Sequence, residues 1–374
     1  MFEIITSSIV LLGVAAYDYK KRRFSSPEDR YMALYGKDEW ESNDMDLFVR
    51  FDPRTDKDVK ETWKQRLHHQ LQRNQDSLLH ETAILREKKI SFQRDTHHVE
   101  ALLKPRKGIY FDITRPGEIQ VVWNHLQMDG VGVWRTIREL FDPNPPLIPY
   151  KEVPAPPPIL PEILSLPKVA GQAMKRGSLY KAAGSELTTG SALWPAAEIR
   201  AFKEKTKTPF NLLTSAIVAK HIFDRHPNVE KLNLGLTVFF PFLKARNRYG
   251  VIIVRVKRGS IEDIAKQLQK RIAKPLVMWG NTATQAYAME RVPDSIFIRL
   301  MKYYRKQIDV LISNVPVGSK PISVGDTPVQ ISCHTRGLSL PYYFLLMGTR
   351  GDIHCSYSSL FSQKDSFFAS PNIS

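Results

Sequence analysis

The sequence contains few cysteines and no cluster of residues with metal-ligand spacing. Its two cysteines, Cys333 and Cys355, form neither a disulfide framework nor a zinc-type pattern. We therefore expect no bound metal and no requirement for an oxidising compartment. Both thiols are predicted to be reduced and to lie in the core or in strands.

The sequence also lacks an apolar run long enough to cross a bilayer. The best candidate, residues 4–17, is shorter than the roughly 20 residues usually needed. Four basic residues, Lys20, Lys21, Arg22 and Arg23, follow this run, which is the reverse of a cleavable signal peptide. A short anchor here would leave the protein on the cytoplasmic side. Residues 1–23 are thus predicted to attach a cytoplasmic protein to an anionic membrane, or to form a terminal helix that docks on the fold or on a partner.

Sequence signals for nucleic-acid binding are absent, although the chain is strongly basic. Lysine and arginine number 54 against 38 acidic residues, which gives a formal net charge of +16. Such a charge favours an acidic partner, for example an anionic membrane, a phosphorylated coenzyme or an acidic protein. We find no zinc-finger spacing, no RNA-binding aromatic signature and no dense basic tract, so we expect no nucleic-acid partner.

The hydrophobic pattern predicts two mixed α/β halves and no short repeat. Prolines are very dense between residues 143 and 167, which excludes regular helix or central strand there. We predict an N-terminal half over residues 24–150, a crossover over 151–192 and a C-terminal half over 193–374. The expected strands are 46–53, 108–113, 118–124, 232–240 and 251–256, with others near residues 310, 329, 344 and 353. The expected helices are 55–75, one from residue 131 to about 141, 196–204, 211–225, 260–273 and 294–306.

A candidate catalytic segment lies where the strand pattern of 118–124 gives way to a helical one. It has the sequence His125-Leu126-Gln127-Met128-Asp129-Gly130. Histidine titrates near neutral pH and suits a general base that takes a proton from an alcohol or amine. Asp129 is predicted to cap the following helix or pair with an arginine, and so to orient the imidazole. Gly130 supplies the backbone freedom of the turn.

This segment resembles the His-His-x-x-x-Asp-Gly motif of the CoA-dependent acyltransferase superfamily. The superfamily includes chloramphenicol acetyltransferases, peptide-synthetase condensation domains and the wax ester synthase/diacylglycerol acyltransferase family. The second, catalytic histidine of the motif matches His125, and Asn124 stands in place of the first. Ile312-Ser313-Asn314-Val315-Pro316 is similar to a Ser-Asn-Val-Pro segment of the wax ester synthase branch. Asn211 and the segment 247–251 follow that family's order, whereas the Asp-Phe-Gly-Trp-Gly motif of plant alcohol acyltransferases is absent.

The resemblance implies two pseudo-symmetric, chloramphenicol-acetyltransferase-like domains with a tunnel between them. It also implies acyl-CoA as a co-substrate, no permanently bound cofactor and direct attack of the acceptor without a covalent enzyme intermediate. Ser313, Asn314 and Thr237 are candidates for substrate binding and for stabilising the oxyanion. The alternative for these three residues is a turn at a strand end that satisfies its own backbone.

Two helices carry basic residues that suggest a binding surface. On the first, residues 260–274, Lys266, Lys270 and Lys274 recur on a face separate from the apolar one. This stripe suits pantetheine phosphates or an acidic carrier protein, and it also fits an ordinary solvated face. The second, residues 294–306, is compatible with a lipid-facing helix or with a core helix.

Three functions remain open at this point. The first is acyl transfer from a thioester to a hydroxyl acceptor, expected to be lipophilic, with His125 as the base. The second is a condensation-type enzyme that uses carrier-protein thioesters. The third is a non-catalytic scaffold that keeps the fold, which the replacement of the first histidine by Asn124 would suit.

Overall fold

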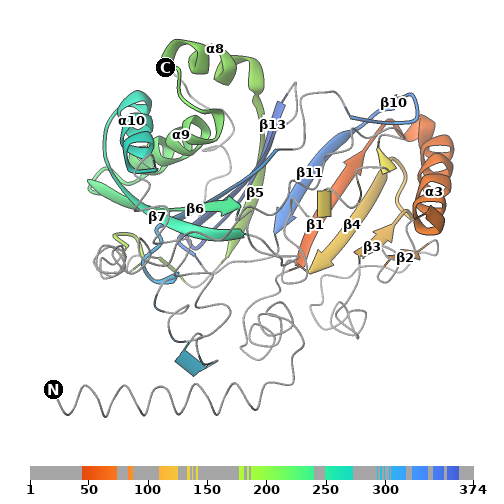
Figure 1. Cartoon of the computed structure of the whole chain (residues 1–374), viewed down its shortest axis with the longest axis horizontal. Helices are drawn as coiled ribbons and strands as arrows, with labels where there is room; N and C mark the ends of the chain where they lie inside the picture. The colour runs from red at the N-terminus through yellow and green to blue at the C-terminus, as the bar shows by residue number, and fades with distance from the viewer. Residues whose placement is uncertain are drawn as a thin grey trace.

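The computed structural model describes two mixed α/β bodies, each built on its own sheet (Figure 1). The described residues are 44–73, 83–86, 109–124, 177–180, 183–184, 187–239, 249–272, 305–316, 322–335, 340–348 and 352–361, with single residues in the intervals 133–141 and 293–303. No described helix combines the length and the apolar character needed to cross a bilayer. Residues 1–23 lie outside the described part.

The first body is a sheet of five described strands in the order β11-β1-β4-β3-β2. Helix α3 (Asp56–Arg73) packs on one face, where the fully buried Trp63 meets Phe111 edge-on with ring centroids 5.9 Å apart. A single 3-10 turn, η1 (Pro53–Thr55), leads from the first strand into α3. The strands are β1 (Asp44–Arg50), β2 (Ala83–Arg86), β3 (Ile109–Asp112), β4 (Glu118–Asn124) and β11 (Gln330–Thr335).

The turn between β3 and β4 depends on a glycine. Gly117 has a φ of 68°, a left-handed conformation that side chains rarely adopt. A β-carbon at this position would also lie 2.9 Å from the Pro53 side chain. The Gly117 amide donates to Asp56 of α3 at 2.7 Å, and its carbonyl accepts from the Phe51 amide at 3.0 Å. This turn therefore fixes the start of α3 against the β3–β4 hairpin.

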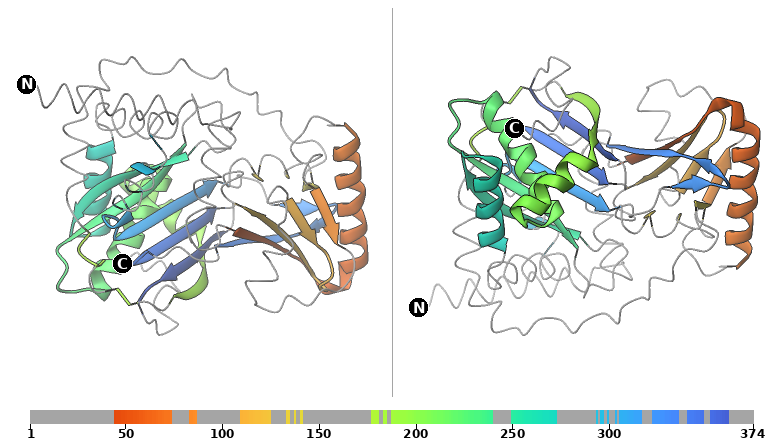
Figure 2. Two further views of the ribbon diagram at one scale, coloured as in Figure 1. Left: turned by 90° about the horizontal axis from the view of Figure 1, so that it is seen from below. Right: turned by 90° about the horizontal axis from the view of Figure 1, so that it is seen from above.

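The second body is a mixed sheet of six described strands in the order β5-β13-β12-β8-β6-β7. Its outer face is covered by helices α8 (Ala196–Thr206), α9 (Phe210–Arg225) and α10 (Ile261–Ile272), so that helices lie on the two outer sides of the molecule (Figure 2). The strands are β5 (Thr188–Pro195), β6 (Lys231–Phe239), β7 (Tyr249–Lys257), β8 (Val310–Pro316), β12 (Tyr342–Gly348) and β13 (Asp352–Ser359). A small hairpin, β9 (Ser323–Val324) with β10 (Thr327–Pro328), precedes β11.

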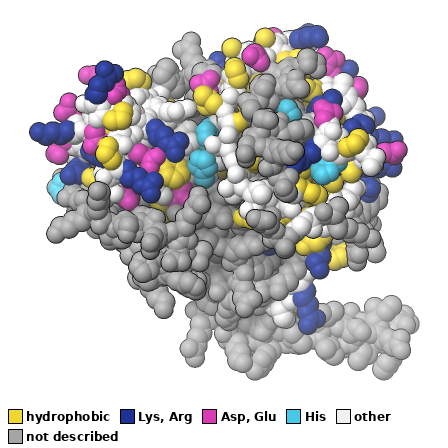
Figure 3. Space-filling view, turned by 180° about the vertical axis from the view of Figure 1, so that it is seen from behind, with side chains coloured by type: hydrophobic (Ala, Val, Ile, Leu, Met, Phe, Trp, Pro, Cys, Tyr) yellow, Lys and Arg dark blue, Asp and Glu magenta, His cyan; other side chains and the backbone are white. Residues whose placement is uncertain are grey.

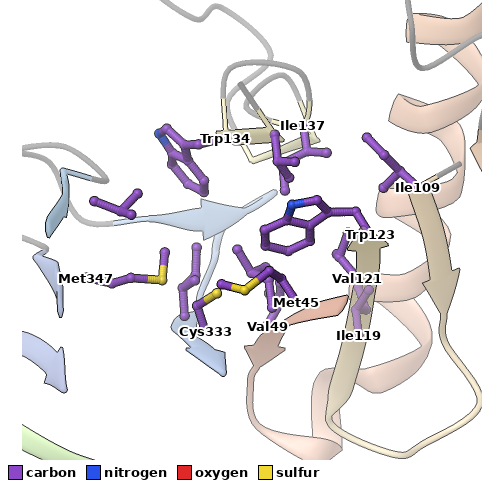
Figure 4. Close-up of a cluster of buried hydrophobic side chains, with 14 of the residues drawn as sticks. Met45, Val49, Ile109, Ile119, Val121, Trp123, Trp134, Ile137, Cys333 and Met347 are labelled. Atoms are coloured by element: carbon purple, nitrogen blue, oxygen red, sulfur yellow. The ribbon is translucent and has the colours of Figure 1, made fainter. Parts of the chain in front are cut away.

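Alternate residues of the second sheet belong to two different cores, because successive side chains of a strand point to opposite faces. On β12, Tyr342 and Phe344 pack with the outer helices. Leu345 and Met347 instead join the core of the first body, which contains Trp123. Figure 4 shows Met347, Cys333 and Trp123 in this shared cluster. The inner face of the second sheet is thus buried against the first body.

The chain also exchanges a strand between the two bodies. β11 lies in sequence between β8 and β12 of the second sheet, yet it pairs with β1 of the first sheet, for example Cys333 opposite Leu47. β5 pairs with β13 and begins at Thr188, inside the segment predicted as a crossover. Both features tie the bodies together more closely than a division at residues 151–192 suggests. The domain boundaries themselves stay a prediction.

A buried carboxylate attaches residues 177–180 to the second sheet. Asp309, with no exposed surface, accepts from the Leu179 amide at 2.6 Å and from the Asn233 amide at 2.8 Å. Burial raises the pKa of this carboxyl, although the backbone donors and Arg255 oppose the shift. A β-carbon at Gly177 would lie 2.6 Å from the same carboxylate, so the chain can approach only with a glycine there.

Candidate functional site

The predicted catalytic segment begins directly after β4. The last residue of β4, Asn124, is paired with Asp44 at the start of β1, and the next residue of β1, Met45, is paired with Thr335 at the end of β11. From Thr335 the chain continues to β12 of the second sheet. The end of β4 therefore points toward the middle of the molecule, where the two bodies meet (Figure 1). His125, Asp129 and Gly130 lie outside the described residues, as does Lys274.

The residues that flank this segment are held in the shared core. Trp123 before it is 2% exposed, and Val133 and Trp134 after it are 1% and 7% exposed. All three belong to the cluster that also contains Met347 of the second sheet. Figure 4 shows Trp134 in the same cluster as Met347 and Trp123. Both ends of the segment are thus fixed at the boundary of the two bodies.

The helical pattern predicted after the segment is confirmed where it is described. Val133, Trp134, Ile137, Leu140 and Phe141 are all buried in the shared core. Phe141 contacts Trp63 and Trp134 with ring centroids 5.1 Å apart in both cases. Arg66 of α3 donates to the carbonyl oxygens of Leu140 and Phe141 at 3.1 and 3.0 Å. These contacts connect the end of the helical stretch that follows the segment to α3.

The structure brings together two of the three residues predicted to bind substrate. The Thr237 hydroxyl of β6 donates to the Ser313 hydroxyl of β8 at 3.3 Å. Both residues are half-buried. Ile312, which precedes Ser313 on β8, packs with the outer helices. Ser313 points to the opposite face of the strand, on which Leu311 belongs to the shared core. The Thr237–Ser313 pair therefore faces the first body, on the same side as the end of β4.

Asn314, the third of these residues, makes contacts on the opposite side of its strand. Its side-chain oxygen accepts from Thr214 of α9 at 3.2 Å, and its amide donates to the Asn211 carbonyl at 3.4 Å. Asn211 lies in the first turn of α9, and its carbonyl also accepts from Ser215 at 2.7 Å. In these contacts Asn314 fixes the start of α9 to β8. Substrate binding by Asn314 stays a prediction.

Helix α10 has the two faces that its sequence predicts. Ile261, Ile264 and Leu268 are buried against the second body, and Lys266 and Lys270 are exposed. Its N-terminus is capped by reciprocal bonds, in which the Asp263 carboxylate accepts from Ser260 at 2.7 Å and the Asp263 amide donates to the Ser260 hydroxyl at 3.1 Å. Binding of an acidic group by this exposed face stays a prediction.

A histidine pair at the boundary of the bodies was not singled out by the sequence. His334 of β11 and His354 of β13 have ring centroids 5.3 Å apart, and the Ser356 hydroxyl lies 2.9 Å from Nδ1 of His334. Polar residues alternate with apolar ones on both strands, which was the available signal. The two cysteines, in contrast, are free and buried on these same strands, as predicted.

The comparisons with known proteins agree with this architecture. No family model and no curated protein matches the chain in sequence. Among solved structures, the first condensation domain of the calcium-dependent antibiotic synthetase matches with a TM-score of 0.57 at 9% identity, over 90% of this chain and 91% of that one. A mutant starter condensation domain of rhizomide synthetase, in complex with C8-CoA and Leu-SNAC, matches with a TM-score of 0.52 at 9% identity, over 90% and 88%.

A wax ester synthase/diacylglycerol acyltransferase from Marinobacter aquaeolei VT8 also matches, with a TM-score of 0.49 at 13% identity, over 89% of this chain and 92% of that one. The match to the first condensation domain covers nine-tenths of the chain and so includes most of both bodies. The chain therefore has the two-body fold of these condensation domains, the chloramphenicol-acetyltransferase-like fold that its sequence predicts.

Proposed function

We propose that this protein transfers an acyl group from a thioester to a hydroxyl acceptor, with His125 as the general base. One observation carries the proposal. The segment that contains His125 starts at the end of β4 and is bounded by Trp123 and Trp134, both buried where the two sheets meet. The fold match to condensation domains, whose chemistry is acyl transfer, adds support.

The chemistry needs one base and one group that stabilises negative charge. His125 takes the proton of the acceptor hydroxyl while its oxygen attacks the thioester carbonyl. The tetrahedral intermediate then collapses to the new ester, and the leaving thiolate recovers the proton from the imidazolium. Removing such a base typically slows the reaction by about 100- to 10,000-fold. Asp129 has a positioning role in this scheme, because it orients the segment without touching the substrate.

Ser313 is the preferred oxyanion donor of the three residues considered. Its hydroxyl accepts a hydrogen bond from Thr237, so its own proton is available for a developing oxyanion. Asn314 is less suited because its side chain holds α9. A Ser313→Ala variant is expected to lower kcat with little change in KM, whereas Asn314→Ala should chiefly lower stability.

The donor is proposed to be acyl-CoA, with a carrier-protein thioester as the second candidate. The second candidate is favoured by the fold match to condensation domains, whereas the exposed Lys266 and Lys270 on α10 suit the phosphates of CoA as well as an acidic carrier protein. A thiol-release assay separates them. Acyl-CoA of several chain lengths and an acyl carrier protein are offered with alcohol and amine acceptors, and free thiol and acylated product are both measured.

We expect acyl-CoA to release thiol only when an acceptor is present. The double variant Lys266→Glu/Lys270→Glu should raise the KM for acyl-CoA. Release only from the carrier protein would identify a condensation-type enzyme. A folded protein that produces no acylated acceptor from either donor would contradict acyl transfer and favour a scaffold role.

A lipophilic acceptor that reaches the site from a membrane also belongs to this proposal. It is motivated by the apolar residues 4–17 and the four basic residues that follow them. Each basic residue near an anionic surface contributes on the order of 1 kcal/mol. The full chain should float with anionic vesicles at low salt and a shortened protein that begins at Phe24 should not. If neither floats, the membrane part of the proposal is wrong.

A further inference from the structure

The second sheet ends on one side at strand β5. In the part of the chain that the structure describes, β5 pairs with β13 alone. The pairing runs without interruption from Thr188 opposite Ser359 to Pro195 opposite Asp352, so no bulge bends the strand away from a neighbour. The backbone groups on the other side of β5 therefore form a regular edge with which a further strand can pair.

The sequence of β5 lacks the features that usually protect such an edge. Natural edge strands are interrupted by charged side chains, above all lysine, or by proline. The strand at the opposite end of the sheet, β7, carries Arg255 and Lys257. β5 has no charged residue among its eight, and its proline is the last of them. An uncharged edge of this length is expected to be covered by a partner strand.

The inner face of β5 is exposed as well. Because side chains alternate along a strand, Thr189, Ser191 and Leu193 share this face, and all three are exposed. Ala192 and Trp194 instead pack with the outer helices. Leu193 is 44% exposed, the largest exposed fraction of any large apolar side chain that the structure describes. The first body thus leaves β5 uncovered, and Figure 3 shows a strip of backbone and uncharged side chains between the charged surfaces of the two bodies.

We propose that β5 pairs antiparallel with β5 of a second copy of this chain, across a two-fold axis at Ser191. In this register Ser191 lies opposite the partner's Ser191, and Leu193 lies opposite the partner's Thr189. An aliphatic side chain and a β-branched one on the same face of a sheet pack well in such a cross-strand pair. The two six-stranded sheets would then form one continuous sheet.

The absence of charge on β5 favours a second copy as the partner. Like charges that face each other across a ladder are destabilising, and self-pairing of β5 brings none together. The same pairing through β7 would place Arg255 and Lys257 beside identical cations. An acidic peptide, which the net charge of +16 would attract elsewhere, finds no cation on β5. A two-fold interface also satisfies the edges of both chains at once, because it uses the same surface twice.

The net charge predicts how the association depends on salt. Two copies that each carry +16 repel each other, and the screening length falls from about 10 Å at 0.1 M salt to about 3 Å at 1 M. The pairing is therefore expected to tighten as the salt concentration rises. The inference is independent of the proposed acyl transfer, because β5 contains none of the residues assigned to that reaction.

The test measures the oligomeric state of the full-length protein by analytical ultracentrifugation, from about 1 to 100 µM and at low and high salt. The disrupting variant is Ser191→Lys, which places two lysine side chains opposite each other on the axis. Ser191→Thr keeps the strand uncharged. Gln269→Lys adds the same charge at an exposed position of α10. All variants keep the apolar residues 4–17, so self-association through that segment would affect them equally.

Hydrogen exchange of the wild type gives a second measurement that needs no variant. The amides of residues 188–195 should exchange more slowly at high protein concentration, because pairing with a second copy protects the edge. Those of α9, which lies on the outer face, should exchange at a rate that does not depend on concentration. If Ser191→Lys fails to fold, as a melting curve would show, this dependence decides the question.

We expect a reversible dimer whose Kd rises about 10-fold or more in Ser191→Lys and stays at the wild-type value in Ser191→Thr and Gln269→Lys. The proposal is overturned if the wild type stays monomeric throughout. Slow exchange of β5 in a monomer would show that another segment of the chain covers the strand, and fast exchange would show an edge that no second copy occupies. A dimer that folded Ser191→Lys leaves intact would also overturn the proposal.

Discussion

Protonation of His354 is predicted to weaken the fold in mildly acidic solution. Burial, the neighbouring His334 and Arg50 lower the pKa of this residue from 6.5 to about 4. In the unfolded chain the imidazole binds a proton below pH ~6.5, whereas in the folded chain it does so only near pH 4. The stability that is present above the unfolded pKa is therefore lost as the pH falls from ~6.5 toward 4.

The size of this loss follows from the difference between the two pKa values. A difference of about 2.5 units corresponds to about 3 kcal/mol once the pH is below both values, and to about 2.5 kcal/mol at pH ~4.5. Other groups also titrate in this range, so the residue's own share is obtained from a comparison of the wild type with His354→Gln.

Urea unfolding of the wild type and of His354→Gln at pH ~7 and pH ~4.5 measures this share. The wild type should lose about 2.5 kcal/mol more than His354→Gln between the two values. The exposed His69 on α3 provides the control, because His69→Gln should leave the wild-type dependence unchanged. Equal losses in the wild type and His354→Gln would refute the reasoning and show that His354 is not held neutral by the fold.

Two further substitutions test the packing that joins the elements. Asp309→Ala should lower the free energy of unfolding by about 3 kcal/mol, because it leaves the buried amides of Leu179 and Asn233 without an acceptor. Urea unfolding measures this loss, and a loss under ~1 kcal/mol would contradict the role assigned to Asp309. Gly190→Ala should cost about 1–3 kcal/mol, because a β-carbon at Gly190 would collide with the Tyr357 hydroxyl; a Tm equal to that of the wild type would show that Tyr357 moves freely.

Much of the secondary structure was predictable from periodicity and turn residues. Strand β4 ends at Asn124 as predicted, α9 begins one residue before its predicted start, and α10 is one residue shorter than predicted at each end. These elements have one regular apolar face and clear stop signals, which local sequence reveals. β2 and β5 were not predicted. In β5 the residues are mainly small and polar, and Trp194 is its only buried residue.

The sequence did not predict which distant strands pair with one another. No local signal in residues 330–335 indicates that β11 leaves its own body to pair with β1. The pairing of His334 with His354 follows from that exchange, so neither histidine differed from an ordinary strand residue in the sequence. Thr237 and Ser313 were named together as candidates without a predicted contact between them, and their contact depends on the parallel pairing of β6 with β8.

The most direct test of the account is the activity of His125→Ala. The wild type and this variant are compared in thiol release from acyl-CoA with a hydroxyl acceptor, and a melting curve of each protein establishes that both are folded. The account predicts a fall in kcat/KM of about 100- to 10,000-fold with little change in Tm. A folded His125→Ala protein that turns over like the wild type would contradict the assignment of His125 as the catalytic base.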